Sequence, residues 1–275
     1  MVAESVATDC VAVTFADGVE SANVVGYQTV NVKAGQWYMV AAQFQGCAET
    51  TAQVALPDLI TTTCTPGASG DFSDPTWNNA PAIQILNEEG TGYKYYFYIN
   101  DAGIDGSDSD PWSATGWASL DDGLLTNVKV NLAKGFWFKA MTDGTITCSG
   151  QVCAADSFER AIPAGQWEIV SNPFPTAIGL ADVVTTGFTP GASGDFSDPT
   201  WNNAPAIQIL NNEGTGYKYY FYINDAGIDG SDSDPWSATG WASLDDGLLT
   251  TGTQLGVGQA FWINSKTAGT LTFEK

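Results

Sequence analysis

The chain has 275 residues, of which 44% are hydrophobic and 12% aromatic, so it is long enough for one large core or two ordinary ones. Its 31 acidic residues against 9 basic ones give a formal net charge of -22, which excludes nucleic acid and anionic membranes as expected partners. No stretch approaches the roughly 20 apolar residues of a membrane-spanning helix. The acidity either keeps an extracellular protein in solution or attracts cations such as Ca²⁺.

The first residues lack the basic and apolar regions of a signal peptide. The composition is rich in Thr, Gly, Ser, Asn and Asp and poor in Lys. This composition favours a secreted protein whose mature chain begins here, so we expect an extracellular or cell-surface location.

An internal repeat organises the sequence. Residues 65–126 recur at 189–250 with a single difference, Glu88 against Asn212. Such identity exceeds what a shared fold requires and indicates a recent duplication.

Weaker similarity extends beyond the repeat block on both sides. Residues 33–44 match 163–174, and a Cys-bearing insertion near 45–64 is present only in the first copy. We therefore predict a first β domain over 1–147 and a second over 148–275.

Each copy reads as short strands separated by turn residues. In the first copy, the strand-like segments are 11–19, 35–44, 81–86, 93–99, 135–141 and 145–152. A hairpin is predicted for 81–86 with 93–99 around NEEGTG, and another for 135–141 with 145–152 around TDGT. Residues 179–184 predict a short helical turn. The predicted fold class is all-β, as two tandem, similar antiparallel β-sandwich or barrel domains.

The segments at the ends of the copies look alike. The final TLTFEK aligns with 145–152, which leads from the first copy into the second, and 11–19 resembles the lead-in of the second copy. Such ends favour a homopolymer assembled head to tail by strand addition at a sheet edge. The alternative is that they are ordinary terminal strands.

The motifs AGQW, SNPFP, WNN, YYFY, GW and Gly-Phe-Trp follow one another in this order. This order resembles repeat modules of the GWNLVSNPFP … GW … GFW type in secreted surface proteins of Planctomycetes, Verrucomicrobia and Lentisphaerae bacteria. The resemblance covers both copies and implies an extracellular, β-rich, often repeated module, without a particular activity. The first copy departs from the pattern with AAQFQG where the second has SNPFP.

An acidic loop is the best candidate site. The segment NDAGIDGSDSDPW occurs at 100–112 and again at 224–236. Hard cations need several oxygen ligands, and glycine permits the tight turns that gather them, so the loop predicts a Ca²⁺ site. The spacing is not that of an EF-hand, and the alternative is a solvated acidic loop. The candidate metal ligands are Asp101, Asp105, Asp108, Asp110, Asp225, Asp229, Asp232 and Asp234.

Recurring tryptophans give a second candidate site. Their faces can stack on sugar rings, although Trp next to Gly or Pro in a β domain commonly packs in the core. The candidates for glycan binding are Trp77, Trp112, Trp117, Trp201, Trp236 and Trp241.

The odd number of cysteines leaves at least one without an intrachain partner. In an oxidising compartment we expect two disulfides and one spare thiol. With no histidine in the chain, metal binding by these residues is the weaker alternative. The candidates for disulfides are Cys10, Cys47, Cys64, Cys148 and Cys153.

Enzymatic activity is not expected, and no catalytic residue is predicted. The absence of histidine removes Ser-His-Asp and Cys-His arrangements, and no phosphate-binding or nucleophile-elbow motif is present. A carboxylate pair of the kind that hydrolyses glycosides stays open, because acids are plentiful. The leading hypothesis is a self-assembling subunit of an extracellular fibre, sheath or surface layer, with Ca²⁺ as a candidate stabiliser. The alternative is a glycan-binding adhesin or carbohydrate-binding module.

Overall fold

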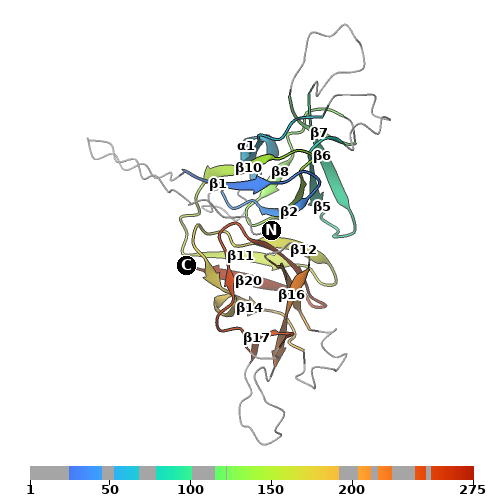
Figure 1. Cartoon of the computed structure of the whole chain (residues 1–275). Coiled ribbons are helices and arrows are strands. Elements are labelled where there is room, and N and C mark those ends of the chain that lie inside the picture. Colours follow the sequence, from blue (N-terminus) through green and yellow to red (C-terminus); the bar gives the residue numbers. More distant parts are fainter. Residues whose placement is uncertain are drawn as a thin grey trace, which may run out of the picture.

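The computed structural model describes the chain in several stretches, and every structural statement below concerns them. They are residues 25–44, 53–67, 79–100, 115–121, 123–191, 204–211, 216–224, 239–245 and 249–275. Here the structure is all-β, as predicted, with antiparallel sheets and very short helices (Figure 1). Among the described residues, no helix has the length and apolarity to cross a membrane.

The first copy forms a set of three sheets, here called unit 1. Its three-stranded sheet has the order β1-β10-β4, its five-stranded sheet the order β2-β9-β5-β6-β7, and a small sheet pairs β3 with β8. The helix α1 (Leu56–Leu59) lies between β3 and β4. The strands are β1 (Val25–Val32), β2 (Trp37–Ala41), β3 (Gln53–Ala55), β4 (Ile60–Thr62), β5 (Ala82–Leu86), β6 (Tyr93–Ile99), β7 (Gly116–Ser119), β8 (Lys129–Asn131), β9 (Gly135–Lys139) and β10 (Gly144–Gln151).

The second copy, unit 2, repeats this strand order. Its sheets are β11-β20-β14, β12-β19-β15-β16-β17 and β13-β18. The 3₁₀ helix η2 (Leu180–Asp182) takes the place of α1 and confirms the predicted helical turn. The strands are β11 (Ser157–Ile162), β12 (Trp167–Ser171), β13 (Ile178–Gly179), β14 (Val184–Thr186), β15 (Ala206–Leu210), β16 (Tyr217–Asn224), β17 (Thr239–Ser243), β18 (Gln254–Leu255), β19 (Ala260–Asn264) and β20 (Gly269–Glu274).

One of the two predicted hairpins is confirmed and the other is wrong. β5 pairs with β6 in an antiparallel hairpin as predicted, and the register runs from Ala82 opposite Phe97 to Leu86 opposite Tyr93. β9 and β10 do not pair with each other, because β9 lies in the five-stranded sheet and β10 in the three-stranded one. The turn TDGT therefore carries the chain from one sheet to the next.

β9 and β10 lie in different sheets because the chain turns a corner between them, side by side with the segment that joins β1 to β2. β1 pairs with β10 and β2 pairs with β9, so the β1–β2 segment runs alongside β9–β10 through both sheets. At the corner, Gly35 N–H donates to Ala140 O at 2.7 Å, and Ala140 N–H donates to Gln36 O at 3.1 Å. Gly35 has φ 79°, a conformation that glycine adopts without steric cost. Strands that switch sheets at such bends are a known way to close β structures.

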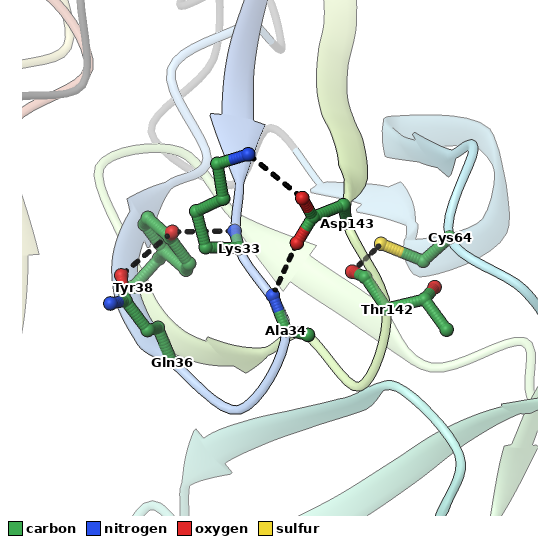
Figure 2. A network of polar contacts seen from close by, with 7 residues as sticks. All are labelled: Lys33, Ala34, Gln36, Tyr38, Cys64, Thr142 and Asp143. Atoms are coloured by element: carbon green, nitrogen blue, oxygen red, sulfur yellow. Dashed lines mark hydrogen bonds and ion pairs between the residues drawn. The ribbon is translucent and has the colours of Figure 1, made fainter.

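Side chains fasten the same corner from outside (Figure 2). The Asp143 carboxylate accepts from Lys33 Nζ at 2.8 Å and from Ala34 N–H at 2.9 Å. The hydrogen bond from Lys33 holds the pKa of Asp143 below its usual value. Tyr38 Oη accepts from Lys33 N–H at 2.7 Å and donates to Gln36 at 3.2 Å. These contacts keep the two turns adjacent.

Each unit has a core to which both of its larger sheets contribute. In unit 1, Phe136 and Phe138 of β9 and Ile83 of β5 meet Ile146 of β10 and Ile60 of β4, and all five are buried. The corresponding cluster in unit 2 includes Ile207, Phe261, Ile263, Leu271 and Phe273. Full burial of such a side chain stabilises the folded state by about 1.5–3 kcal/mol.

The strand pattern bears on the predicted boundary between the copies. β10 continues to Gln151 and stays paired with β1 there, and β11 begins at Ser157. A boundary at 147/148 therefore falls inside β10, and the chain passes from one unit to the next between these two strands. The predicted strand at 11–19 lies outside the described residues.

Candidate functional site

The predicted calcium ligands lie outside the described residues. These are Asp101, Asp105, Asp108, Asp110, Asp225, Asp229, Asp232 and Asp234. The residues that begin the two acidic segments are described. Asn100 Oδ1 accepts from Thr115 Oγ1 at 2.9 Å, and Asn224 accepts from Thr239 at 2.8 Å. Both units thus hold the start of the segment in the same way. Over the described part of the chain, no group of three or more Asp, Glu or Cys residues is placed to hold a metal ion.

The structure places two of the six candidate tryptophans in the interior. Trp117 and Trp241 are only 2% and 3% exposed. Trp117 packs against Tyr98 with 5.2 Å between ring centroids, and Trp241 against Tyr222 with 5.4 Å. Their predicted stacking on glycans is therefore wrong, and they support the core instead. The other four candidates, Trp77, Trp112, Trp201 and Trp236, lie outside the described residues.

Two of the cysteines are free thiols, so the expectation of two disulfides is not met. Cys64 and Cys148 are both free and buried in the unit 1 core. Burial raises the pKa of the Cys148 thiol to about 12, which makes it unreactive. Cys153 is disulfide-bonded. Cys10 and Cys47 lie outside the described residues.

The two free cysteines occupy positions that are aromatic in unit 2. Cys64 precedes the repeated TPG as Phe188 does, and Cys148 of β10 corresponds to Phe273 of β20. Phe188 and Phe273 are buried in the unit 2 core. In unit 1, the cysteines therefore serve as small apolar core residues.

The most prominent feature that the sequence did not reveal is the junction between the units. The two five-stranded sheets meet through Ala41, Ile169 and Ala260, which are buried together (Figure 1). Gly135 allows this approach, because a Cβ atom there would collide with Ile169. Met39, Trp137 and Trp262 pack against the same cluster.

Main-chain contacts also cross the junction. Lys134 of unit 1 forms an antiparallel bridge with Val170 of β12, and Ser171 N–H donates to Ala133 O at 3.0 Å. β12 is the edge strand of its sheet, so residues 133–134 extend that sheet. Ala133 has φ 60°, the left-handed conformation that is costly for a residue with a Cβ atom.

A buried ionic cluster lies beside these contacts. Lys134 Nζ lies 3.0 Å and Arg160 Nη2 3.3 Å from Glu168 Oε2. The side chains of Lys134 and Glu168 are only 11% and 6% exposed. Removing one partner of such a pair leaves a buried charge without compensation. The cluster therefore ties the register of unit 1 to that of unit 2.

Aromatic residues line the open part of the junction in matching pairs. Trp37 meets Trp137 edge to face at 6.4 Å, and Trp167 meets Trp262 at 6.0 Å. Trp137 lies close to the Tyr93 hydroxyl, and Trp262 lies close to that of Tyr217. Burial raises the pKa of both tyrosines, and the nearby Tyr217 raises that of Tyr93 further. Equivalent residues of the two units thus come together in one aromatic cluster.

A cavity of about 350 Å³ opens between the units at this cluster. It is lined by Leu86, Gly90, Thr91, Gly92, Tyr93, Trp167, Gln208 and Trp262. A larger cavity of about 590 Å³ lies within unit 2 and includes Lys218, Thr253 and Gln254. In unit 1, Val128 occupies the position of Thr253 and packs against the core.

These site residues carry a repeated signal in the sequence. Trp37 and Trp167 belong to the AGQW motif of each copy, and Trp137 and Trp262 to the Phe-Trp motif.

Comparisons with protein-family models, with curated proteins and with solved structures give no match for this chain. The candidate site therefore rests on the geometry of the junction.

Proposed function

We propose that this protein is an extracellular structural protein whose units associate within and between chains into a fibre, sheath or surface layer. The observation that carries the proposal is the junction, where residues 133–134 of one unit extend an edge strand of the other. The chain thus already contains one antiparallel main-chain bridge between two copies of the same unit. Duplicated units present duplicated surfaces, which is what a repeating assembly requires.

Edge strands with exposed apolar side chains supply surfaces for contacts between chains. β1 ends the three-stranded sheet of unit 1 and exposes Val25 and Tyr27 at 58% and 45%. β14 ends the matching sheet of unit 2 and exposes Val184 at 48%. Because these edges belong to different units, pairing of β1 with β14 of another chain is head to tail and propagates.

Electron microscopy and light scattering test this proposal on the purified full chain. We expect filaments or sheets to form as the protein concentration rises, and Val184→Lys to weaken them by placing a charge on the edge. Lys129→Ala, a change on a strand of the small sheet, is the matched control. A chain that stays strictly monomeric at high concentration, with and without Ca²⁺, would overturn the proposal.

Calcium binding by the two acidic segments is part of the same proposal. The many carboxylates in each segment repel one another, and a divalent cation relieves that repulsion. Calorimetric titration of Ca²⁺ into the chelator-treated protein tests it, with Asp105→Asn and Asp229→Asn combined as the variant. Binding that is absent from the wild-type chain contradicts a calcium role and leaves assembly to be judged separately.

The finer architecture is also proposed. We infer that each unit is a domain in which the three-stranded and five-stranded sheets form a sandwich. Support comes from the cores, to which strands of both sheets contribute, and from the corners at which strands switch sheets. A scaffold of this kind acts through its surfaces, and we propose no catalytic activity for it.

Glycan binding is the second candidate function. Trp117 and Trp241 are buried and do not support it, whereas Trp77, Trp112, Trp201 and Trp236 lie outside the described residues. Its support comes from another place in the fold. It lies in the solvent-accessible part of the junction, where Trp167 lines the cavity and is 37% exposed.

A further inference from the structure

The cavity at the junction differs from ordinary surface hollows in its composition. Two indole rings, Trp167 and Trp262, and the phenol ring of Tyr93 lie around it. None of the described residues in its lining is charged. Its volume of about 350 Å³ falls within the range of small-ligand sites, roughly 300–1,000 Å³. The lining combines flat apolar faces with a few polar groups, a combination that suits an amphipathic ligand.

Both units are needed to build this cavity. The turn between β5 and β6 of unit 1 supplies Gly90, Thr91 and Gly92, while β12, β15 and β19 of unit 2 supply the opposite side. Gly90 has φ 65°, and a Cβ atom on it would lie 3.1 Å from Trp167 O. Glycine therefore lets the turn approach β12 closely enough to form a wall.

The polar groups in the lining have unused hydrogen-bonding capacity. The Gln208 amide forms no side-chain hydrogen bond within the described part of the chain. The Tyr93 hydroxyl, which can donate and accept, is a further polar group in the lining. Thr91 is tied to Asn87: Asn87 Oδ1 accepts from Thr91 N–H at 2.9 Å, and Asn87 Nδ2 donates to Thr91 Oγ1 at 3.3 Å, which leaves the Thr91 hydroxyl able to donate.

These features match the two faces of a sugar. The axial C–H groups of a pyranose ring form a flat apolar surface that packs on an indole face, and its hydroxyls need amide and hydroxyl partners. The net charge of -22 disfavours anionic ligands such as uronic acids or sulfated sugars. The ligand class that fits is therefore a neutral saccharide.

We propose that the cleft between the two units binds a neutral oligosaccharide, with Trp167 as the stacking platform and Gln208 as the main hydrogen-bonding group. This site is distinct from the tryptophans of the repeat block. It does not depend on assembly between chains, because one chain supplies every lining residue.

Calorimetric titration of the full chain tests the proposal, at a concentration at which light scattering gives one chain per particle. The probes are β-1,4-linked oligomers of glucose, xylose, mannose and N-acetylglucosamine, with an oligoproline peptide as the competing class of ligand. We expect at least one neutral oligosaccharide to bind. Trp167→Ala and Gln208→Ala each lower that affinity by about tenfold or more, and Trp167→Phe retains part of it.

Trp37→Ala is the matched control. Trp37 is the counterpart of Trp167 in unit 1 and packs on Trp137 in the same way, but it does not line this cavity. We expect Trp37→Ala to bind the oligosaccharide like the wild type, and near-ultraviolet circular dichroism to show that all variants are folded. Three results overturn the proposal: no oligosaccharide binds, oligoproline alone binds, or Trp167→Ala binds as tightly as the wild type.

Discussion

Units 1 and 2 share a strand order and yet fill equivalent positions with different chemistry. Cys64 and Cys148 in unit 1 stand where unit 2 has Phe188 and Phe273. The near-identical block, by contrast, supplies β5–β7 in one unit and β15–β17 in the other. The core beneath the three-stranded sheet thus tolerates a large change in side-chain volume, so the fold alone does not account for the identity of the block.

The junction shows a second difference. At equivalent positions, unit 1 has Tyr38, which is hydrogen-bonded at its own corner, and unit 2 has Glu168, which binds Lys134 across the junction. The residue at this position therefore stabilises a turn within unit 1, whereas in unit 2 it stabilises the contact between the two units. Four sets of substitutions test this asymmetry, and the largest effect is expected at Glu168.

Glu168→Ala is expected to lower the free energy of unfolding by about 3–5 kcal/mol, because Lys134 and Arg160 then keep buried charges without a counterion. Equilibrium unfolding in urea, followed by tryptophan fluorescence, measures the loss. Asp143→Asn, which breaks the exposed pair with Lys33, is the control and is expected to cost far less. Equal losses in the two variants would show that the junction is not held by the buried cluster.

Phe273→Cys gives unit 2 the residue that unit 1 has at Cys148. The unit 2 core is filled by the ring, so the change leaves a cavity and is expected to cost about 2–4 kcal/mol. Cys148→Phe tests the reverse direction, and we expect overpacking to cost about 1–3 kcal/mol. Thermal unfolding of both variants is the measurement. If both changes were neutral, neither core would be adapted to its own residue.

Ala133 and Gly258 are equivalent residues with positive φ, 60° and 65°. Gly258→Ala is expected to destabilise the protein by about 1–2 kcal/mol, because it introduces left-handed strain and its Cβ atom meets the Gln28 side chain. Ala133→Gly is expected to stabilise it by up to about 1 kcal/mol by removing that strain. The denaturant midpoints of the two variants are the measurement. Gly258→Ala should lower the midpoint and Ala133→Gly should raise it, and shifts in the same direction would contradict the prediction.

Tyr93 and Tyr217 provide the smallest effect, which depends on pH. Burial raises the pKa of both above the ordinary value of 10.0. The unfolded chain therefore loses these protons first as the pH rises past 10, and the folded state loses stability from there upward. Ultraviolet titration of phenolate formation, compared between the wild type and Tyr93→Phe, should show the removal of a late-titrating group. If the curves differ only near pH 10, the junction does not bury Tyr93.

Local patterns in the sequence predicted the local parts of the fold. The segments 81–86 and 93–99, joined by a glycine-containing turn, form the β5–β6 hairpin as predicted. The repeat predicted that the two copies share one architecture, and their sheet orders agree. The corner at TDGT could not be predicted in this way, because β10 pairs with β1 and β4, which both lie far away in the sequence. A turn motif predicts where the chain bends, but it does not predict which strand the following segment pairs with.

The site was predictable only in its residue type. The aromatic clusters in the sequence indicated tryptophan as the type of residue in the site. The alternation of side chains along a strand does not predict which face of the sheet is buried. Trp117 faces the core of its own unit, whereas Trp167 lies at the edge of the junction. That difference depends on how one unit sits on the other, which neither copy encodes by itself.

The pairing of β1 with β10 has a mechanical consequence. Val25, at the start of β1, lies opposite Gln151, at the end of β10, and Ser157 of β11 lies opposite Glu274 of β20 in the same manner. Each unit therefore receives and releases the chain at the same end of one strand pair. From β11 onward, unit 2 contains no cysteine, so a tensile force applied along the polypeptide peels β11 from β20 one hydrogen bond at a time, instead of shearing all of the bonds together. A load-bearing fibre made of this protein would have to transmit tension through lateral contacts between units, because the covalent chain through unit 2 would act as a weak, extensible tether.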